Sequence, residues 1–261
     1  MYHSVSRHAE DGVAPYYRLS TSPARFREHM RLLADGGYTV TSLAQAIETT
    51  RLGRSRKPHV VVTFDDGYLD FLTEAWPVLE ALSFTATVFL PTAFIGRQRL
   101  GFKGRECLTW SEVRDLSHRG VSFGSHTVTH PVLHGLPWSE VRSELRESRE
   151  RIEQALGSRV TTFAYPFAFP QHDRGFVSRF CEELHEQGYR ASVTTAIGRL
   201  APGGDPLRIK RLPVNDSDDP RLLAAKLAGA YDWLGVLQSA WKRVRPHRRA
   251  TQSYSTMHQT L

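Results

Sequence analysis

Residues 59–67 read HVVVTFDDG, a short apolar run that ends in two adjacent carboxylates, Asp65 and Asp66. The β-branched residues of the run predict a buried strand. The two carboxylates lie where this strand ends, and neighbouring negative charges repel each other and lose solvation free energy there. The rest of the chain therefore has to supply a positive partner for them.

Strand-like and helix-like segments alternate along the rest of the chain. We expect strands at residues 38–43, 59–64, 85–90, 121–126, 161–167 and 190–195, and helices at residues 22–37, 43–51, 69–82, 109–120, 143–157 and 175–188. This alternation predicts an α/β fold in which outer helices cover a parallel sheet. About seven or eight such units in one domain favour a (β/α) barrel over an open sheet. Asp65, Asp66, His126 and Phe167 all follow predicted strands, and functional side chains of such folds gather at the carboxyl ends of the strands.

The chain has no internal repeat and no low-complexity linker, so we expect one domain over residues 1–240. Apolar periodicity is lost beyond that point, and we expect residues 241–261 to form a basic, disordered tail. The chain opens with MYHSV, which resembles the last part of a buried strand and leaves open whether further residues precede it. The compartment depends on that point: an upstream export signal predicts the cell envelope, and its absence predicts the cytoplasm.

Composition argues against several classes of function. The net charge is +7, but much of the excess lies at residues 51–59 and 241–250, and no nucleic-acid-binding motif accompanies these basic stretches. No stretch has the roughly 18 consecutive apolar residues that span a membrane. Cys107 and Cys181 match no metal-binding or redox spacing. The sequence therefore favours a globular enzyme without a nucleic-acid partner, and it does not indicate an oligomeric state.

A second string, SHTVTH, places His126 and His130 four residues apart after a predicted strand. On one helical turn, or in a tight loop, this spacing can bring two imidazoles to one cation, and Asp66 would supply a third ligand. Two nitrogens and one oxygen leave positions for water and substrate, as in catalytic metal sites. A cation held there would also let Asp65 stay ionised and act as a base. Taken singly, DDG is commonly a turn and a histidine pair is commonly structural, so it is the conjunction of the two strings that predicts a metal site.

TFDDG followed by SHTVTH resembles the first two motifs of the polysaccharide deacetylases of carbohydrate esterase family 4, the NodB homology domain. The resemblance implies a distorted (β/α) barrel and the metal-dependent removal of N-acetyl groups from a glycan substrate of the N-acetylglucosamine type. It also implies that Asp65 is the general base and that the metal is held by Asp66, His126 and His130. Zinc (Zn²⁺) is the first choice of ion, and Ni²⁺, Co²⁺, Fe²⁺ or Mn²⁺ suit the same ligands.

The third motif of the family, Arg-x-Pro-Tyr or Arg-x-Pro-Phe, stands here as AYPF at residues 164–167, without its arginine. The resemblance implies that the backbone N–H of Phe167 contributes to an oxyanion hole, a role that needs no side chain. Arg211, in the string RLPVN, is a candidate for the missing cation beside the catalytic aspartate, and an unrelated surface arginine is the alternative.

Removal of an acetyl group from nitrogen also needs an acid, because an unprotonated amine is a very poor leaving group. The chain resembles a circularly permuted branch of the family that acts on exported poly-N-acetylglucosamine, in which the acid histidine lies on the first strand. His3 in MYHSV is the matching residue, and a structural histidine is the alternative.

Four aromatic residues near the predicted strand ends are candidates for stacking on sugar rings, with core packing as the alternative for each; these are Tyr68, Phe94, Trp110 and Tyr165. Two competing hypotheses remain for the function. One is an amidase or O-acetyl esterase that uses the same metal site, and the other is a catalytically silent carbohydrate-binding module.

Overall fold

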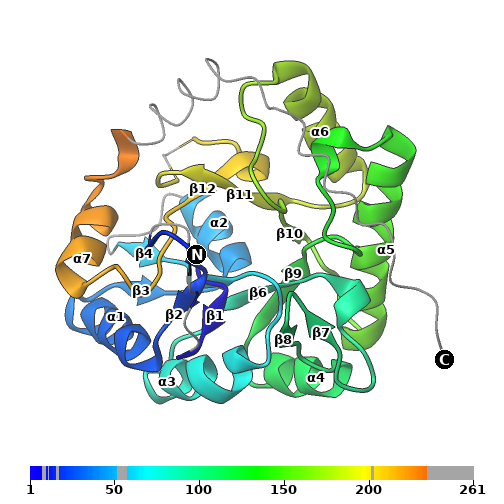
Figure 1. Ribbon diagram of the computed structural model, residues 1–261. Helices are drawn as coiled ribbons and strands as arrows, with labels where there is room; N and C mark the ends of the chain where they lie inside the picture. The colour runs from blue at the N-terminus through cyan, green and yellow to red at the C-terminus, as the bar shows by residue number, and fades with distance from the viewer. Residues whose placement is uncertain (8–9, 11, 16–17, 52–57, 201–202, 234–261) are drawn as a thin grey trace.

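A parallel sheet of six strands forms the centre of the protein, in the spatial order β12-β11-β10-β9-β6-β5. The strands are β5 (Thr63–Phe64), β6 (Thr87–Leu90), β9 (Ser122–Ser125), β10 (Thr162–Ala164), β11 (Ala191–Ile197) and β12 (Ile209–Arg211). The computed structural model describes residues 1–7, 10, 12–15, 18–51, 58–200 and 203–233, so the predicted tail at 241–261 lies outside the described residues. The strands curl into an inner ring with helices around them (Figure 1). The predicted α/β barrel with parallel strands and outer helices is confirmed.

Helices lie at all the predicted segments, although α5 begins before the predicted residue 143, and α7 was not predicted. Their bounds are α1 Pro23–Asp35, α2 Leu43–Arg51, α3 Trp76–Ala81, α4 Trp110–His118, α5 Trp138–Leu156, α6 Arg174–Glu186 and α7 Pro220–Ala228. Helix α4 begins at a capping box, in which Thr109 and Glu112 satisfy each other's backbone N–H groups. The helix predicted at 69–82 instead begins with a π-helical turn at Phe71–Ala75. Pro77 lies in the first turn of α3 and has no N–H to donate, which is compatible with the wider turn before it.

The first residues of the chain close the gap between the two edges of the sheet. The nitrogen of Met1 donates to the carbonyl of Leu212, just beyond β12, at 2.9 Å. The N–H of Tyr2 donates to the carbonyl of Thr63 on β5 at 2.8 Å. This segment therefore acts as a short strand of the barrel and brings His3 to the carboxyl end of β5.

Three smaller strand pairs surround this barrel. β1 (Ser4–Val5) and β2 (Ser20–Thr21) pair in parallel after the closing segment, and β3 (Thr39–Val40) pairs in parallel with β4 (His59–Val60). The third pair is an antiparallel hairpin of β7 (Gly101–Phe102) and β8 (Arg105–Glu106), which the sequence did not predict.

Packing inside the barrel is tight around β9. Gly124 of β9 is required there, because a Cβ atom would lie 2.6 Å from the ring of Phe89 and from Oγ1 of Thr162. At the amino end of the strands, the N–H of Leu43, the first residue of α2, donates to Oγ1 of Thr87 at the start of β6. Helix α2 thus covers the amino end, and the carboxyl end carries the polar residues described below. No helix of the described residues is both long and apolar enough to cross a membrane.

Candidate metal and catalytic site

The structure brings Asp66, His126 and His130 together at the carboxyl ends of β5 and β9. One ligand atom from each residue lies within 4.8 Å of the others, and all three residues are buried. Oδ1 of Asp66 lies 3.3 Å from Nε2 of His130 and 3.6 Å from Nε2 of His126. The two sequence motifs therefore meet in a group that could hold a metal ion.

The hydrogen bonds of these residues fit a divalent cation. Nδ1 of His126 lies 2.8 Å from the carbonyl of Ala164, and because a carbonyl only accepts, Nδ1 carries the proton and Nε2 keeps its lone pair. Burial lowers the pKa of His126 to about 4, so the imidazole is neutral near pH 7, as a ligand must be. Oδ1 of Asp66 is buried without a hydrogen-bond partner among the described residues, which leaves an acceptor facing the two imidazoles.

The segment from His126 to His130 is a tight loop and not a helical turn. Thr127 and His130 both have left-handed backbones, with φ of 70° and 57°, and Oγ1 of Thr127 accepts from the N–H of His130. The ring of His130 lies between Phe102 and Phe167, with centroids at 5.2 and 4.6 Å. Aromatic packing therefore orients this imidazole, whose Nδ1 has no hydrogen-bond partner within the part of the chain that is described.

Asp65 contacts a cationic side chain, Arg211 of β12. The guanidinium forms two parallel hydrogen bonds of 2.7 Å to the carboxylate, and both side chains are buried. Burial alone would raise the pKa of Asp65, but the charge of Arg211, helped by His126, outweighs that effect and holds this pKa well below its usual range. Asp65 is therefore ionised at neutral pH, and Arg211 is its buried partner and not a surface arginine.

His3 and Phe167 complete the group at this end of the barrel. Nε2 of His3 lies 3.9 Å from Oδ2 of Asp65, and its side chain is 18% exposed. Burial lowers the pKa of His3, while the charges of Asp65 and Asp66 oppose that effect. Phe167 follows β10 in a left-handed conformation, with φ of 56° and a half-exposed ring. Within the described residues the backbone N–H of Phe167 donates to no other group.

Two further residues contact Asp66, and neither contact was predicted. Oη of Tyr68 donates to Oδ2 of Asp66 at 3.0 Å, and Nζ of Lys103 lies 3.5 Å from the same oxygen. The position of Tyr68, two residues after Asp66, could have indicated the first of these contacts. Lys103 comes from the unpredicted hairpin of β7 and β8, and no spacing in the sequence indicates its approach.

For two of the four candidates for sugar stacking, the alternative of core packing is the correct one. Tyr165 is 1% exposed and Tyr68 is 2% exposed, because both pack into the core, so neither ring can meet a glycan. Phe94 and Trp110 are partly buried against the same core, and their contact with substrate stays a prediction. The half-exposed ring at the site belongs to Phe167 instead.

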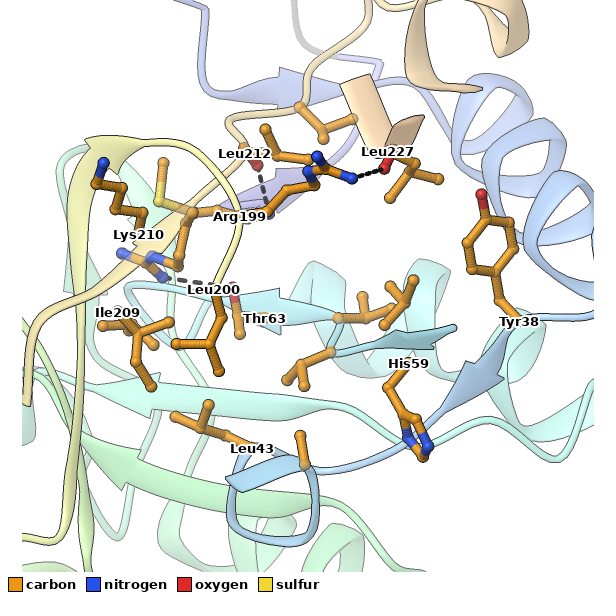
Figure 2. Close-up of a pocket in the computed structure, with 18 of the residues that line it drawn as sticks. Tyr38, Leu43, His59, Thr63, Arg199, Leu200, Ile209, Lys210, Leu212 and Leu227 are labelled. Carbon is orange, nitrogen blue, oxygen red and sulfur yellow. Dashed lines mark hydrogen bonds between the residues drawn. The ribbon is translucent and has the colours of Figure 1, made fainter. Parts of the chain in front are cut away.

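A separate cavity of about 670 Å³ lies between β4, β5, β12 and the helices α1, α2 and α7. Its lining is mainly aliphatic, and Tyr38 and His59 lie on the opposite side of it from Lys210 and Ile209 (Figure 2). Arg211 is part of its wall, so the cavity approaches the polar site from the side without containing Asp65.

Comparison with known proteins agrees with this geometry. The family model described as polysaccharide deacetylase matches residues 53–192, and the chain therefore belongs to the polysaccharide deacetylase family. YxkH of Bacillus subtilis strain 168, whose name places it among the polysaccharide deacetylases, is 30% identical over 203 residues, which cover 76% of this chain and 64% of YxkH.

The chain is also similar to a curated relative whose name gives a substrate and to a solved structure with the same fold. The poly-beta-1,6-N-acetyl-D-glucosamine N-deacetylase of Escherichia coli K12 is 33% identical over 229 residues, which cover 75% of this chain and 34% of that enzyme. The chain thus spans less than two thirds of the length of each of these curated relatives. The deacetylase PplD of Streptococcus pyogenes superposes with a TM-score of 0.75 at 22% identity, covering 87% of this chain and 95% of PplD, which shows a shared fold.

Proposed function

We propose that this protein removes N-acetyl groups from a glycan of the N-acetylglucosamine type, in a reaction that depends on a divalent metal. The observation that carries the proposal is that two adjacent aspartates with different partners lie at one end of the barrel. Asp66 faces two imidazoles, and Asp65 is held ionised by Arg211. The name of the Escherichia coli relative favours a β-1,6-linked poly-N-acetylglucosamine as the substrate.

Asp66, His126 and His130 would hold the metal, because they offer one oxygen and two nitrogens from buried side chains. Zinc suits this donor set best, and nickel, cobalt, iron or manganese suit it as well. When bound, such an ion acts as a Lewis acid that polarises the acetamide carbonyl and makes a water more acidic.

The other residues of the site would move protons and stabilise charge. The ionised Asp65 accepts a proton from the attacking water, which adds to the carbonyl carbon of the acetamide group. The N–H of Phe167 donates to the oxyanion that develops. His3 then donates a proton to the departing nitrogen as the C–N bond breaks, releasing acetate and a free amino sugar. Burial lowers the pKa of His3, which makes the protonated imidazole a stronger acid, and the charges of Asp65 and Asp66 partly oppose that effect.

Metal content and acetate release test the proposal together. Asp66→Asn and His126→Ala are expected to lose the bound metal in elemental analysis, whereas Asp65→Asn keeps the metal and loses the activity. Substrates are an N-acetylglucosamine oligomer, its O-acetylated counterpart and a small non-sugar acetamide. Unchanged metal content in Asp66→Asn and His126→Ala would refute the ligand assignment. Faster acetate release from the ester or from the small amide would favour the competing hypothesis of an esterase or amidase. Glycan binding without turnover would favour a carbohydrate-binding module.

A further inference from the structure

The ammonium group of Lys103 lies 3.5 Å from Oδ2 of Asp66, the carboxylate assigned above to the metal. We propose that Lys103 competes with the divalent ion for this carboxylate, so that it weakens metal binding and keeps the ion exchangeable. The inference rests on the proposed metal site and adds to it a residue that sets its affinity.

The backbone of the hairpin directs Lys103 toward the site. Lys103 and Gly104 form its turn with φ of 51° and 76°, a left-handed conformation that is costly for a lysine. The turn lays the lysine side chain against two rings of the site, with Nζ at 4.4 Å from the centroid of Phe102 and at 5.3 Å from that of Phe167. Cation–π contacts of this kind restrict where the ammonium group can lie.

The hairpin is also tied to the rest of the barrel. Arg105 of β8 donates from Nη1 to the hydroxyls of Ser4 and Ser6, at 2.8 and 3.0 Å, and from Nη2 to that of Ser20 at 2.7 Å. These serines lie on or next to the β1 and β2 strands. Lys103 is therefore presented to Asp66 by an anchored element and not by a free loop.

The hydrogen bond from Nζ of Lys103 to Oδ2 of Asp66 is long, at 3.5 Å, and does not by itself explain why the lysine lies there. Oδ2 of Asp66 already accepts from the hydroxyl of Tyr68, so Lys103 is not needed to satisfy that oxygen. The other nearby cation, Arg211, is occupied by Asp65. Lys103 therefore places a positive charge beside a carboxylate that a divalent ion would also need, and like charges near one ligand reduce the affinity for the ion.

The alternative is that Lys103 forms an ordinary surface ion pair, which would contribute little. Its side chain is 38% exposed, so this alternative predicts no effect on metal affinity. Zinc affinity distinguishes the two, measured on the whole chain by competition with a chromogenic chelator. Lys103→Met keeps the apolar side chain against the rings and removes the charge, and it is expected to bind zinc about tenfold more tightly than the wild type.

Two control variants separate charge from other effects. Lys103→Arg keeps the charge and is expected to bind zinc like the wild type, as is Lys210→Met, which removes an equal charge from β12, away from Asp66. Equal or weaker zinc binding by Lys103→Met, in a protein whose metal-free melting temperature is unchanged, would overturn the inference while leaving the proposed function standing. Zinc binding by Asp66→Asn as tight as that of the wild type would instead refute the metal site, and the inference with it.

Discussion

Replacement of Arg211 by methionine is the most direct test of how the site keeps Asp65 ionised. Methionine removes the guanidinium and keeps most of the apolar volume. Asp65 is 2% exposed and would lose two hydrogen bonds of 2.7 Å together with its counter-charge. Removing one partner of such a buried pair typically costs about 3–5 kcal/mol, because the remaining charge is left in a medium of low dielectric.

Protonation of Asp65 sets an upper limit on that cost. Near pH 7 the solution lies roughly three units above the ordinary pKa of an aspartate, at about 1.4 kcal/mol per unit, so neutralising the carboxylate costs roughly 4 kcal/mol. In Arg211→Met, burial is no longer opposed by the guanidinium and raises the pKa of Asp65. The stability deficit of the variant is therefore expected to be about 3–4 kcal/mol at pH 7 and to shrink as the pH falls toward 5.

Urea denaturation at pH 5 and pH 7 measures this deficit, with Asp65→Asn and the double variant completing a mutant cycle. The double variant is expected to lose less stability than the two single variants lose together, by about 2 kcal/mol or more, because the two groups form one unit. Acetate release by Arg211→Met should also shift toward higher pH, following the raised pKa of the base. A loss below about 1 kcal/mol at pH 7 that is also independent of pH would refute the reasoning.

Three further predictions concern the acid, the metal and a buried histidine. His3→Ala is expected to lower kcat by roughly 10²–10⁴-fold with unchanged metal content, and an enzyme that keeps full turnover would assign His3 a structural role. Zinc at a hundred times its Kd should stabilise the wild type by about 2.7 kcal/mol and leave Asp66→Asn unaffected, as a shift in melting temperature shows. His29 accepts from the hydroxyl of Tyr2 and donates to the carbonyl of Asp218, and burial lowers the pKa of this histidine below its usual 6.5. The unfolded chain therefore binds a proton near pH 6.5 that the folded protein does not. The contribution of His29 to the free energy of unfolding is fully present above that pH, and it falls at lower pH by at most about 1.4 kcal/mol per pH unit. Equal pH slopes in His29→Gln and the wild type would contradict this.

The meeting of Asp66, His126 and His130 could be predicted because short-range patterns carry these residues. Asp65 and Asp66 are adjacent, His126 and His130 lie four residues apart, and each pair follows a strand that its own β-branched or aromatic residues predict. Parallel strands then bring such ends to one face of a barrel without further information. Local sequence was sufficient for this part of the site.

The sequence could name Arg211 only as a candidate partner of Asp65, because this approach depends on how the barrel closes. The two residues are 146 positions apart, and β12 is only three residues long, with a buried, exposed, buried pattern. Closure depends on backbone hydrogen bonds from Met1 and Tyr2, which any residue other than proline could make. A contact made by backbone groups cannot be predicted from side-chain periodicity. The hairpin that carries Lys103 could not be predicted from that periodicity either.

Backbone strain explains how two neighbouring carboxylates can face two different sets of partners. Six non-glycine residues have positive φ among the described residues; five of them lie at this site, namely Asp66, Lys103, Thr127, His130 and Phe167, and the sixth is Ser83. Such conformations cost of order 1–3 kcal/mol each and persist only where their surroundings enforce them. The N–H of Asp65 still donates across the barrel to Tyr2, as in a strand, whereas Asp66 has φ of 70°. Gly67 continues the left-handed turn in a space where a Cβ would lie 2.7 Å from Leu90. The change of conformation between the two aspartates sends one carboxylate to the buried arginine and the other to the two imidazoles, so the repulsion expected from the sequence is relieved by two separate partners.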